Sequence, residues 1–375
     1  MRRGLAGGGI AVCLAVGWWC FLAGPREHPA MHFSSGRPPV SAARCAACHP
    51  GQAGSLAQAP HSLTLHLAST PDLLAEFDGL RFHDSLVNDT TDMLEVRDRK
   101  LWRRNTSFPD PIPIDWHFGS GRHARTPVTV RETAHGTTEL LEHNLSWYPG
   151  VGLDRTLGST NASESPPGWH GLGKRLPPAE AADCFGCHST WLPQHRGRLD
   201  LERIVPGVQC ARCHLEGERH LAAVETGAAT LQMERWSDLS PLESIRRCGE
   251  CHRRDDQLPR DELRPDNLLL VRFAPVGLSQ SRCFTAQVET KDVRGNSLRM
   301  DCLTCHDPHR EAETDAAFYT ERCVKCHGTQ SGQAHPCTSQ ASSGQCLDCH
   351  MPKVEVQPHL RFTDHWIRTR RDGRH

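Results

Sequence analysis

The sequence has little of the apolar material that a chain of its length usually buries. Only 37% of its 375 residues are hydrophobic, it has 2 tyrosines, and its mean hydropathy is −0.52. By length alone, the chain would form two or three domains with ordinary hydrophobic cores. The composition instead predicts a thin protein core that folds around some other apolar mass.

The chain also lacks an excess of charge of either sign. It has 43 basic and 44 acidic residues, and its formal net charge is −1. The basic residues are dispersed, apart from a short tail, "RTRRDGRH". Because binding of nucleic acid requires clustered basic residues, we expect no nucleic-acid partner.

Long apolar runs are absent after the first 30 residues. Before that, Arg2 and Arg3 precede an apolar run from Gly4 to Gly24, which ends at a proline and charged residues. This pattern predicts export, with residues 1–27 as a signal peptide or an N-terminal membrane anchor. No clear small-residue cleavage site decides between the two. We expect the protein in the periplasm or at the periplasmic face of the inner membrane, with possible anchoring through residues 4–24.

Cysteine and histidine, by contrast, are abundant, at 18 and 24 residues. Most of the cysteines lie in a C-x-x-C-H pattern, for which random placement gives only about 0.05 copies per chain. The pattern occurs seven times, and we number the copies motif 1 to motif 7 in chain order: CAACH (45–49), CFGCH (184–188), CARCH (210–214), CGECH (248–252), CLTCH (302–306), CVKCH (323–327) and CLDCH (346–350).

The spacing of this pattern is typical of c-type haem attachment. Two thiols on one turn add to the two vinyl groups of a porphyrin, and the histidine that follows becomes the proximal iron ligand. We therefore predict seven covalently attached haems c. The predicted attachment residues are Cys45, Cys48, Cys184, Cys187, Cys210, Cys213, Cys248, Cys251, Cys302, Cys305, Cys323, Cys326, Cys346 and Cys349. The predicted proximal ligands are His49, His188, His214, His252, His306, His327 and His350.

Two other uses of cysteine explain the pattern less well. Structural zinc sites also use C-x-x-C pairs, but they need no histidine after every second cysteine. A disulfide framework leaves the same histidines unexplained. Outside the motifs, Cys283 and Cys337 would form a disulfide in an exported protein, and the alternative is two free thiols.

Each iron also has a sixth coordination position. After the seven proximal histidines, 17 histidines remain, whereas the chain has only 6 methionines. Ligation by two histidines is therefore expected. It closes the iron to substrates and is typical of electron transfer.

The motifs are unevenly distributed along the chain. Motif 1 is followed by a long stretch without motifs, in which residues 80–148 alternate as strands do, with a turn at His135 and Gly136. We expect short helices at about 53–69 and 215–228, and a Pro/Gly-rich linker at 165–178. The predicted fold class is a mainly α and irregular multihaem fold, with short helices around packed haems and a small antiparallel β layer at about residues 80–148. The expected domains are 40–165 and 178–368.

Four segments carry a resemblance to a known family: "SQSRCF…DCLTCHDPHR", "GSGRHARTPV", "CARCHLEGERH" and "CLDCHMP…PHLRFTDHWIR". They resemble the multihaem cytochrome c region of exported bacterial proteins, of the c-552/c-554-like type, which is often joined to tetratricopeptide repeats. The resemblance covers roughly residues 40 to 370. The sequence contains no such repeats, so no repeat-based partner surface is expected. "CARCHLEGERH" also lacks the Gly-Pro-Gly that is usual in its loop.

The resemblance ranks the remaining histidines as distal ligands. His309 lies too close to His306 in the chain to cap the same iron, so we expect it to cap a neighbouring one. The distal candidates are His61, His83, His123, His220, His309, His359 and His365, and the weaker ones are His66, His170, His195 and His335.

The sequence thus predicts a heptahaem electron carrier with redox-protein partners, either a membrane quinol oxidoreductase or a periplasmic reductase. The alternative is a multihaem oxidoreductase of the nitrite or hydroxylamine type, with one open-coordination haem. No C-x-x-C-K motif supports it, and only Tyr148 and Tyr319 could place a tyrosine beside such a haem. No catalytic residue is assigned.

Overall fold

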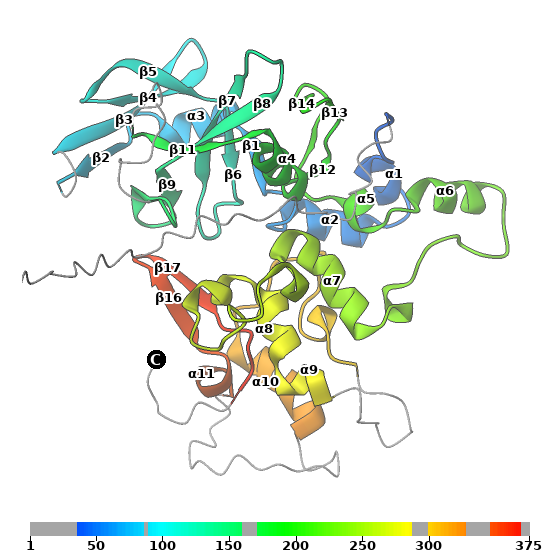
Figure 1. Ribbon diagram of the computed structural model, residues 1–375. Helices are drawn as coiled ribbons and strands as arrows, with labels where there is room; N and C mark the ends of the chain where they lie inside the picture. The colour runs from blue at the N-terminus through cyan, green and yellow to red at the C-terminus, as the bar shows by residue number, and fades with distance from the viewer. Residues whose placement is uncertain (1–35, 86–88, 160–170, 287–298, 328–345, 369–375) are drawn as a thin grey trace, which may run out of the picture. The chain divides into compact units, whose positions relative to one another are not determined.

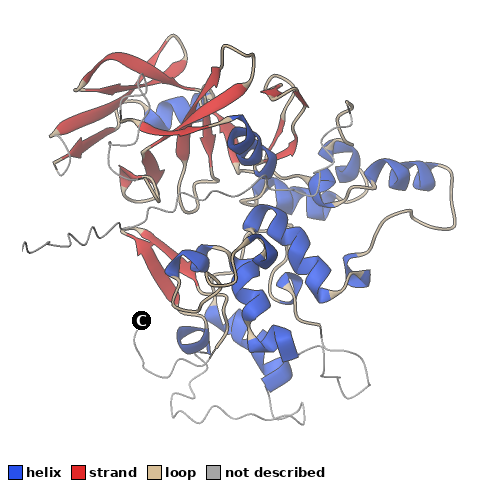
Figure 2. Cartoon of the chain, viewed as in Figure 1, coloured by secondary structure: helices blue, strands red, loops and turns tan. Residues whose placement is uncertain are grey.

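The computed structural model describes residues 36–85, 89–159, 171–286, 299–327 and 346–368. The predicted N-terminal segment, His170, His335 and Cys337 lie outside these ranges. None of the helices within them is long and apolar enough to cross a membrane. Figure 1 follows the chain from its N-terminal to its C-terminal end, and Figure 2 separates helices from strands.

The chain begins with two short helices that carry motif 1. Helix α1 (Ala42–Ala46) holds Cys45, and α2 (Pro50–Gln58) starts directly after the motif histidine, with Pro50 in its first turn. Proline favours this position because its missing N–H would have no partner there. The helix predicted over 53–69 therefore starts earlier, at Pro50. It also ends earlier, at Gln58, because Ala59, the residue before Pro60, has an extended backbone.

A four-stranded antiparallel sheet follows, with its strands in chain order. It consists of β2 (Arg81–Asp84), β3 (Thr90–Arg97), β4 (Lys100–Asn105) and β5 (Phe108–Ile114). Helix α3 (Pro71–Phe77) contacts β3 and β4. Leu73 and Phe77 of this helix pack on Leu94 and Leu101 of the strands, so alternate strand residues form one hydrophobic core.

A five-stranded antiparallel sheet positions motif 2. Its order is β1 (Leu65–Leu67), β6 (Trp116–Phe118), β7 (Thr126–Glu132), β8 (Thr138–His143) and β11 (Gly173–Leu176). Helix α4 (Pro178–Cys187) contacts β8 and buries Ala181 and Phe185 in a second core with Leu140 and Trp116. Both cysteines of motif 2 lie at the end of this anchored helix.

The other strands form two-stranded hairpins and pairs. They are β9 (Leu145–Tyr148) with β10 (Gly152–Arg155), β12 (Ser189–Trp191) with β15 (Val205–Pro206), β13 (Gln194–His195) with β14 (Arg198–Leu199), and β16 (Lys353–Gln357) with β17 (Leu360–Thr363).

The remaining motifs lie on short helical segments. The α-helices are α5 (Cys210–Cys213), α6 (Gly217–Glu225), α7 (Pro241–His252), α8 (Ala274–Gln280), α9 (Arg282–Ala286), α10 (Ala316–His327) and α11 (Cys346–His350). The 3-10 turns are η2 (Trp236–Asp238), η3 (Asp255–Gln257), η4 (Leu268–Arg272) and η5 (Cys302–Thr304). Here the buried apolar cluster is small: Leu258, Leu270 and Val276.

The predicted fold class is wrong. Helices account for 34% and strands for 26% of the described residues, and the strands run from Leu65 to Thr363 rather than over 80–148 alone. The missed strands have two to five residues, too few for an alternating pattern, and distant partners stabilise some of them: β1 pairs with β6, and β11 with β8. The linker expected at 165–178 contains β11, whereas the helix expected near 215–228 is present as α6.

Candidate haem centres

Each described motif places its two cysteines on a helical or 3-10 turn. In α5 and α11, for example, the motif itself is the helix, and in α7 and α10 it forms the last turn. Residues three apart share one face of a helix, so both thiols can reach one ligand. No motif cysteine forms a disulfide in the structure, so none is withheld from haem attachment.

Four motif histidines face a second histidine from a distant part of the chain. The ring centroids of these pairs are 6.2 to 6.4 Å apart. The pairs are His49 with His220, His61 with His252, His214 with His309, and His306 with His365.

This spacing is the one that an iron between the rings requires. With nitrogens about 2.0 Å from the metal and about 1.1 to 1.2 Å from their ring centroids, two axial imidazoles have centroids roughly 6.2 to 6.4 Å apart. Rings in direct stacking contact lie closer, as His117 and Phe77 do at 4.4 Å. The four pairs therefore leave room for one metal atom each.

Hydrogen bonds orient the distal member of every pair. In each, Nδ1 lies within hydrogen-bonding distance of an oxygen: Pro308 O for His61 (3.2 Å), Leu231 O for His220 (2.7 Å), Asp307 Oδ1 for His309 (2.9 Å) and Thr363 O for His365 (2.9 Å). Metal-binding histidines commonly donate from the nitrogen that does not bind the metal. This arrangement leaves Nε2 of each ring free for iron.

Burial keeps several of these imidazoles neutral. It lowers the pKa of His252 to about 4, with further contributions from His61, His188 and His365. It also lowers the pKa of His306 to about 4, with a smaller contribution from His365. Because only a neutral imidazole has a lone pair for a metal, these rings are ligand-competent at neutral pH.

The other three proximal histidines have no such pair within the described ranges. Nδ1 of His188 lies 2.8 Å from Thr64 O and 2.6 Å from Thr64 Oγ1, and the Phe118 ring lies 4.9 Å from the His188 ring. His350 donates to Arg368 O at 3.1 Å. His327 ends α10. These residues stay predicted proximal ligands.

Three distal candidates have other partners. His83 lies on β2, beside Thr91 and Asp89. His359 occupies the turn of the β16–β17 hairpin with a φ of 69°, and its Nε2 lies 3.3 Å from Asp154 Oδ2. The structure does not bring either beside a motif histidine.

The structure also describes the third of these candidates, His123, and two of the weaker candidates, His66 and His195. The His123 ring lies 5.3 Å from the Phe362 ring, on the hairpin that follows motif 7. Nε2 of His66 lies 2.6 Å from Leu63 O, and His195 is exposed on β13. All of these stay predicted candidates for distal ligation.

A cavity beside His306 has the chemistry of a haem edge. It measures about 350 Å³ and is lined by Cys305, His306, Phe318 and the basic residues Arg310, Arg322 and Lys325, together with Asp307, Glu311 and Glu313. A haem carries two carboxylates on an apolar ring, and basic side chains around such a space suit carboxylates. The residues present therefore fit the group.

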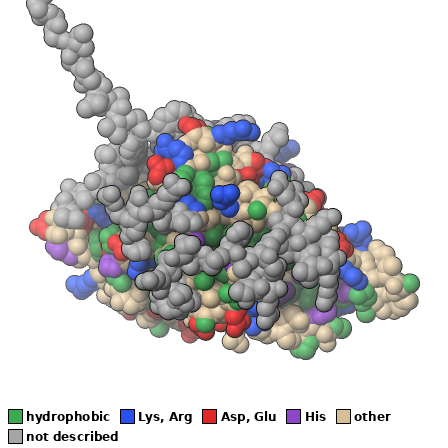
Figure 3. Space-filling model, turned by 90° about the horizontal axis from the view of Figure 1, so that it is seen from below, with side chains coloured by type: hydrophobic (Ala, Val, Ile, Leu, Met, Phe, Trp, Pro, Cys, Tyr) green, Lys and Arg blue, Asp and Glu red, His purple; other side chains and the backbone are tan. Residues whose placement is uncertain are grey.

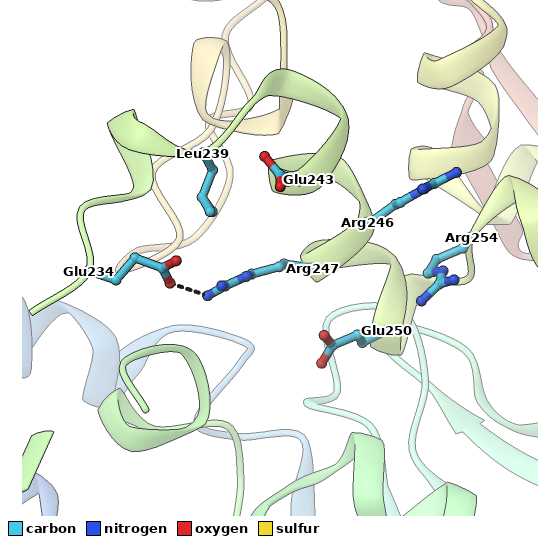
Figure 4. A pocket seen from close by; sticks show the side chains of 7 residues that line it. All are labelled: Glu234, Leu239, Glu243, Arg246, Arg247, Glu250 and Arg254. Atoms are coloured by element: carbon cyan, nitrogen blue, oxygen red, sulfur yellow. Dashed lines mark ion pairs between the residues drawn. The ribbon is translucent and has the colours of Figure 1, made fainter. Parts of the chain in front are cut away.

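A second cavity has a different character. It measures about 260 Å³ and is lined by Leu239 and charged residues, three of them arginines. Figure 4 shows Arg247 reaching Glu234, with 2.6 Å between Nη1 and Oε2. Within the described part of the chain, no group of three or more His, Cys, Asp or Glu residues lies close enough to hold a metal ion.

Sequence reasoning missed the residues that support the ligands. Thr64 holds His188, Pro308 holds His61 through its carbonyl, and Arg212 lies with Nη2 3.7 Å from Cys251 Sγ. Backbone carbonyls leave no trace in a sequence. Pro308, within "CHDPH", and Arg212, within "CARCH", lay in segments that the sequence had already singled out.

One family model of known proteins covers two of these motifs. Residues 170–215, which contain motifs 2 and 3, match the family model of cytochrome c554 and c-prime. The match and the motifs support a multihaem c-type cytochrome with covalent haem c, and electron transfer as its function. Among solved structures, an outer cell wall cytochrome, OcwA, is similar at 14% identity with a TM-score of 0.49, over 88% of this chain and 79% of that chain. No curated protein matches.

Proposed function

We propose that the protein is an exported heptahaem c-type cytochrome that relays electrons between redox proteins. The observation that carries this proposal is the set of four histidine pairs at 6.2 to 6.4 Å, each of which joins a motif histidine to a distant one. Two histidines on one iron occupy both axial positions, so substrates are excluded and electron transfer is favoured.

The chain's own residues prepare these sites for that role. When bound, haem supplies the iron that changes redox state. The histidines fix both axial positions, and their Nδ1 partners, such as Pro308 O and Leu231 O, hold the ring orientations. Rigidly held ligands change their positions little between oxidised and reduced iron. This lowers the reorganisation energy of each electron transfer.

The proposed partners are a membrane quinol oxidoreductase or a periplasmic reductase. The apolar run from Gly4 to Gly24 supports export and a periplasmic location, free or anchored. On the face seen in Figure 3, basic, acidic and histidine side chains are interspersed. A mixed surface of this kind suits brief docking with another redox protein rather than binding to a polyanion.

One observation favours a second candidate function, catalysis at the motif 2 haem. His188 has no histidine opposite it within the described residues, and its nearest aromatic neighbour is the Phe118 ring. An iron without a sixth ligand could bind a small molecule such as nitrite or hydroxylamine. The protein would then be an oxidoreductase whose other haems supply or remove electrons.

Two measurements on the mature protein test these proposals. Its intact mass should exceed that of the polypeptide by seven haems, and a mass with five or fewer would contradict the count. The electron paramagnetic resonance spectrum of the oxidised protein should contain only low-spin ferric haem. A large high-spin signal at neutral pH, with binding of nitrite or cyanide, would instead establish the enzyme.

A further inference from the structure

We infer that helix α7, which carries motif 4, is the junction of the haem array: motifs 2, 3 and 5 each contact it, whereas the other motifs extend from these neighbours. The inference rests on the proposed electron relay and adds its route. In Figure 1, α7 lies between the segments that carry the early motifs and those that carry the late ones.

Motif 2 reaches α7 through its second cysteine. Sγ of Cys187 lies 3.9 Å from the backbone carbonyl oxygen of Glu250. Glu250 lies between the two cysteines of motif 4. The attachment points of the two haems are therefore adjacent.

Motif 3 reaches the same helix through Arg212. This residue lies between Cys210 and Cys213, and its Nη1 is 3.7 Å from Glu250 Oε2. Its Nη2 lies 3.7 Å from Cys251 Sγ. One side chain of motif 3 thus contacts both the acidic residue and the second attachment point of motif 4.

Motif 5 contacts α7 along its 3-10 turn, η5. Arg299, three residues before Cys302, donates to Leu239 O at 2.6 Å and to Trp236 O at 3.0 Å, in the segment that leads into α7. These bonds hold the start of motif 5 against the start of α7.

The loop from His306 to His309 connects the irons of motifs 3, 4 and 5 independently. His306 is the proximal ligand of motif 5, and His309 faces His214 of motif 3. Between them, Pro308 O accepts from His61, the histidine that faces His252 of motif 4. Four consecutive residues therefore touch three iron sites.

The outer motifs continue from these neighbours. Helix α1 of motif 1 contacts α5 of motif 3, and α10 of motif 6 contacts α11 of motif 7. Tyr319 of α10 lies 5.6 Å, between ring centroids, from His306 of motif 5. The resulting order is 1–3–4–5–6–7, with motif 2 as a side branch on motif 4.

This order predicts which haem can interrupt the relay. One electron leaves a reduced iron at one end and reduces an oxidised iron at the other, and in this order it passes through the site of His252. Blocking that site should divide the array into motifs 1 and 3 on one side and motifs 5, 6 and 7 on the other. Blocking the site of His49, at an end, should remove one site and leave the rest connected.

The experiment locks single haems in the reduced state. His61→Ala opens the motif 4 iron, and the control His220→Ala opens the motif 1 iron, so that carbon monoxide can hold either one ferrous. A one-electron photoreductant then delivers less than one electron per molecule, and redistribution among the haems is followed by transient absorbance. We expect H61A with carbon monoxide to lose redistribution between the two groups, and H220A with carbon monoxide to retain it among the remaining haems.

The outcomes separate the inference from the proposed function. Wild-type protein without rapid redistribution would contradict the relay itself. If electrons redistribute in the wild type and H61A behaves as H220A does, only the junction at α7 is overturned. An H61A protein that binds no carbon monoxide would also overturn the junction.

A variant without the side branch provides a check that does not depend on His61. The double variant C184A/C187A should lose one haem by mass and still redistribute electrons among the other six. Division of the array in this variant would place motif 2 on the main route and contradict the branch.

Discussion

At the scale of single residues, each ligand site depends on the two nitrogens of one imidazole. One nitrogen binds a protein oxygen, and the other is left for the iron. Nδ1 of His365 lies 2.9 Å from Thr363 O, while the ring lies 6.2 Å from His306. His359, six residues earlier, instead faces Asp154 from a hairpin turn. Two histidines of one segment therefore have different roles, and a pair of matched variants separates them.

His365→Ala should open the sixth position of the motif 5 iron. No thiol or proximal ligand changes, so the mass should still include every haem. The oxidised protein should gain a high-spin signal, and the reduced protein should bind carbon monoxide. His359→Ala is the control, and its spectra should equal those of the wild type. The reverse result, with changed spectra only in H359A, would reassign the distal ligand.

His117 is a buried histidine that no motif uses. It is 0% exposed, neither ring nitrogen has a partner in the described structure, and burial lowers its pKa to about 3, with smaller contributions from Arg125 and His66. The unfolded chain takes up this proton near pH 6.5 while the folded chain stays neutral. Stability is therefore lost as the pH falls from about 6.5 towards 3.

Replacing His117 by Phe removes this pH dependence and keeps the ring packing on Phe77. Between pH 7 and pH 5, the free energy of unfolding should fall by about 2 kcal/mol less in H117F than in the wild type. Urea unfolding followed by far-ultraviolet circular dichroism at both pH values measures the difference. Equal losses in the two proteins would show that His117 already finds a proton acceptor when folded.

The proximal side of the predicted site follows from the sequence more directly than the distal side does. Cys and His of one motif are close because they are adjacent in the chain, and local geometry suffices. His220 and His309, in contrast, approach their motif histidines only through the fold. The resemblance ranked both as candidates, but residue type alone could not separate His365 from His359.

At the scale of elements, short connecting segments set the ligand positions. Gly207 follows β15 with a φ of 74°, and a Cβ there would overlap the carbonyl of Ser62. The next residue, Val208, donates to His61 O at 2.8 Å. This close approach of two backbones holds the segment that presents His61 to the motif 4 iron.

Gly207→Ala should therefore disturb a haem that it does not touch. The strained backbone costs roughly 1–3 kcal/mol, and the displaced Ser62 should carry His61 away, so that carbon monoxide binds the reduced protein. The control is Gly227→Ala, which has a similar φ of 66° but no atom within 4 Å of the new Cβ. G227A should lose some stability and bind no carbon monoxide. The same carbon monoxide binding in both variants would rule out the contact with Ser62 as the cause.

Elements were predictable where their pattern was local. The turn at Gly136 joins β7 and β8, whose five paired residues alternate well enough to be recognised in the sequence. Strands β12 to β15 have only two or three residues and exist through pairing and burial of Trp191 and Leu199. Nothing in so few residues distinguishes a strand from a loop, and the predicted fold class was wrong for this reason.

At the scale of the whole molecule, three of the four proposed distal histidines follow a regular pattern, and His61, which pairs with His252 of motif 4, does not. His220 follows motif 3 and faces motif 1, His309 follows motif 5 and faces motif 3, and His365 follows motif 7 and faces motif 5. Each of these sites is completed by a segment two motifs further along the chain. Coordination would therefore bind successive parts of the chain to one another, as a hydrophobic core does in other proteins.

The distribution of buried apolar residues shows which part of the chain lacks a hydrophobic core and needs coordination in its place. The two larger apolar clusters lie in the sheets, one around Phe77 and Leu94, the other around Leu140 and Phe185. The helical part from α7 onward has a cluster of three buried residues. Burial of apolar surface is the main stabilising contribution in folding, so this part depends most on its haems.

Protein made without haem attachment should therefore fold in part. Limited trypsin digestion, analysed by mass spectrometry, should cut residues 241–368 rapidly and leave residues 65–155 largely protected, whereas the mature protein should resist cleavage in both. A covalently attached haem buries its apolar ring and gains its distant axial histidine only in the folded state. Without haem, the segment with the smallest core therefore loses its main support. Equal protection of both regions in haem-free protein would show that the helical part folds on its own contacts, such as the Ser240–Glu243 capping box of α7 and the packing of Leu258 on Val276.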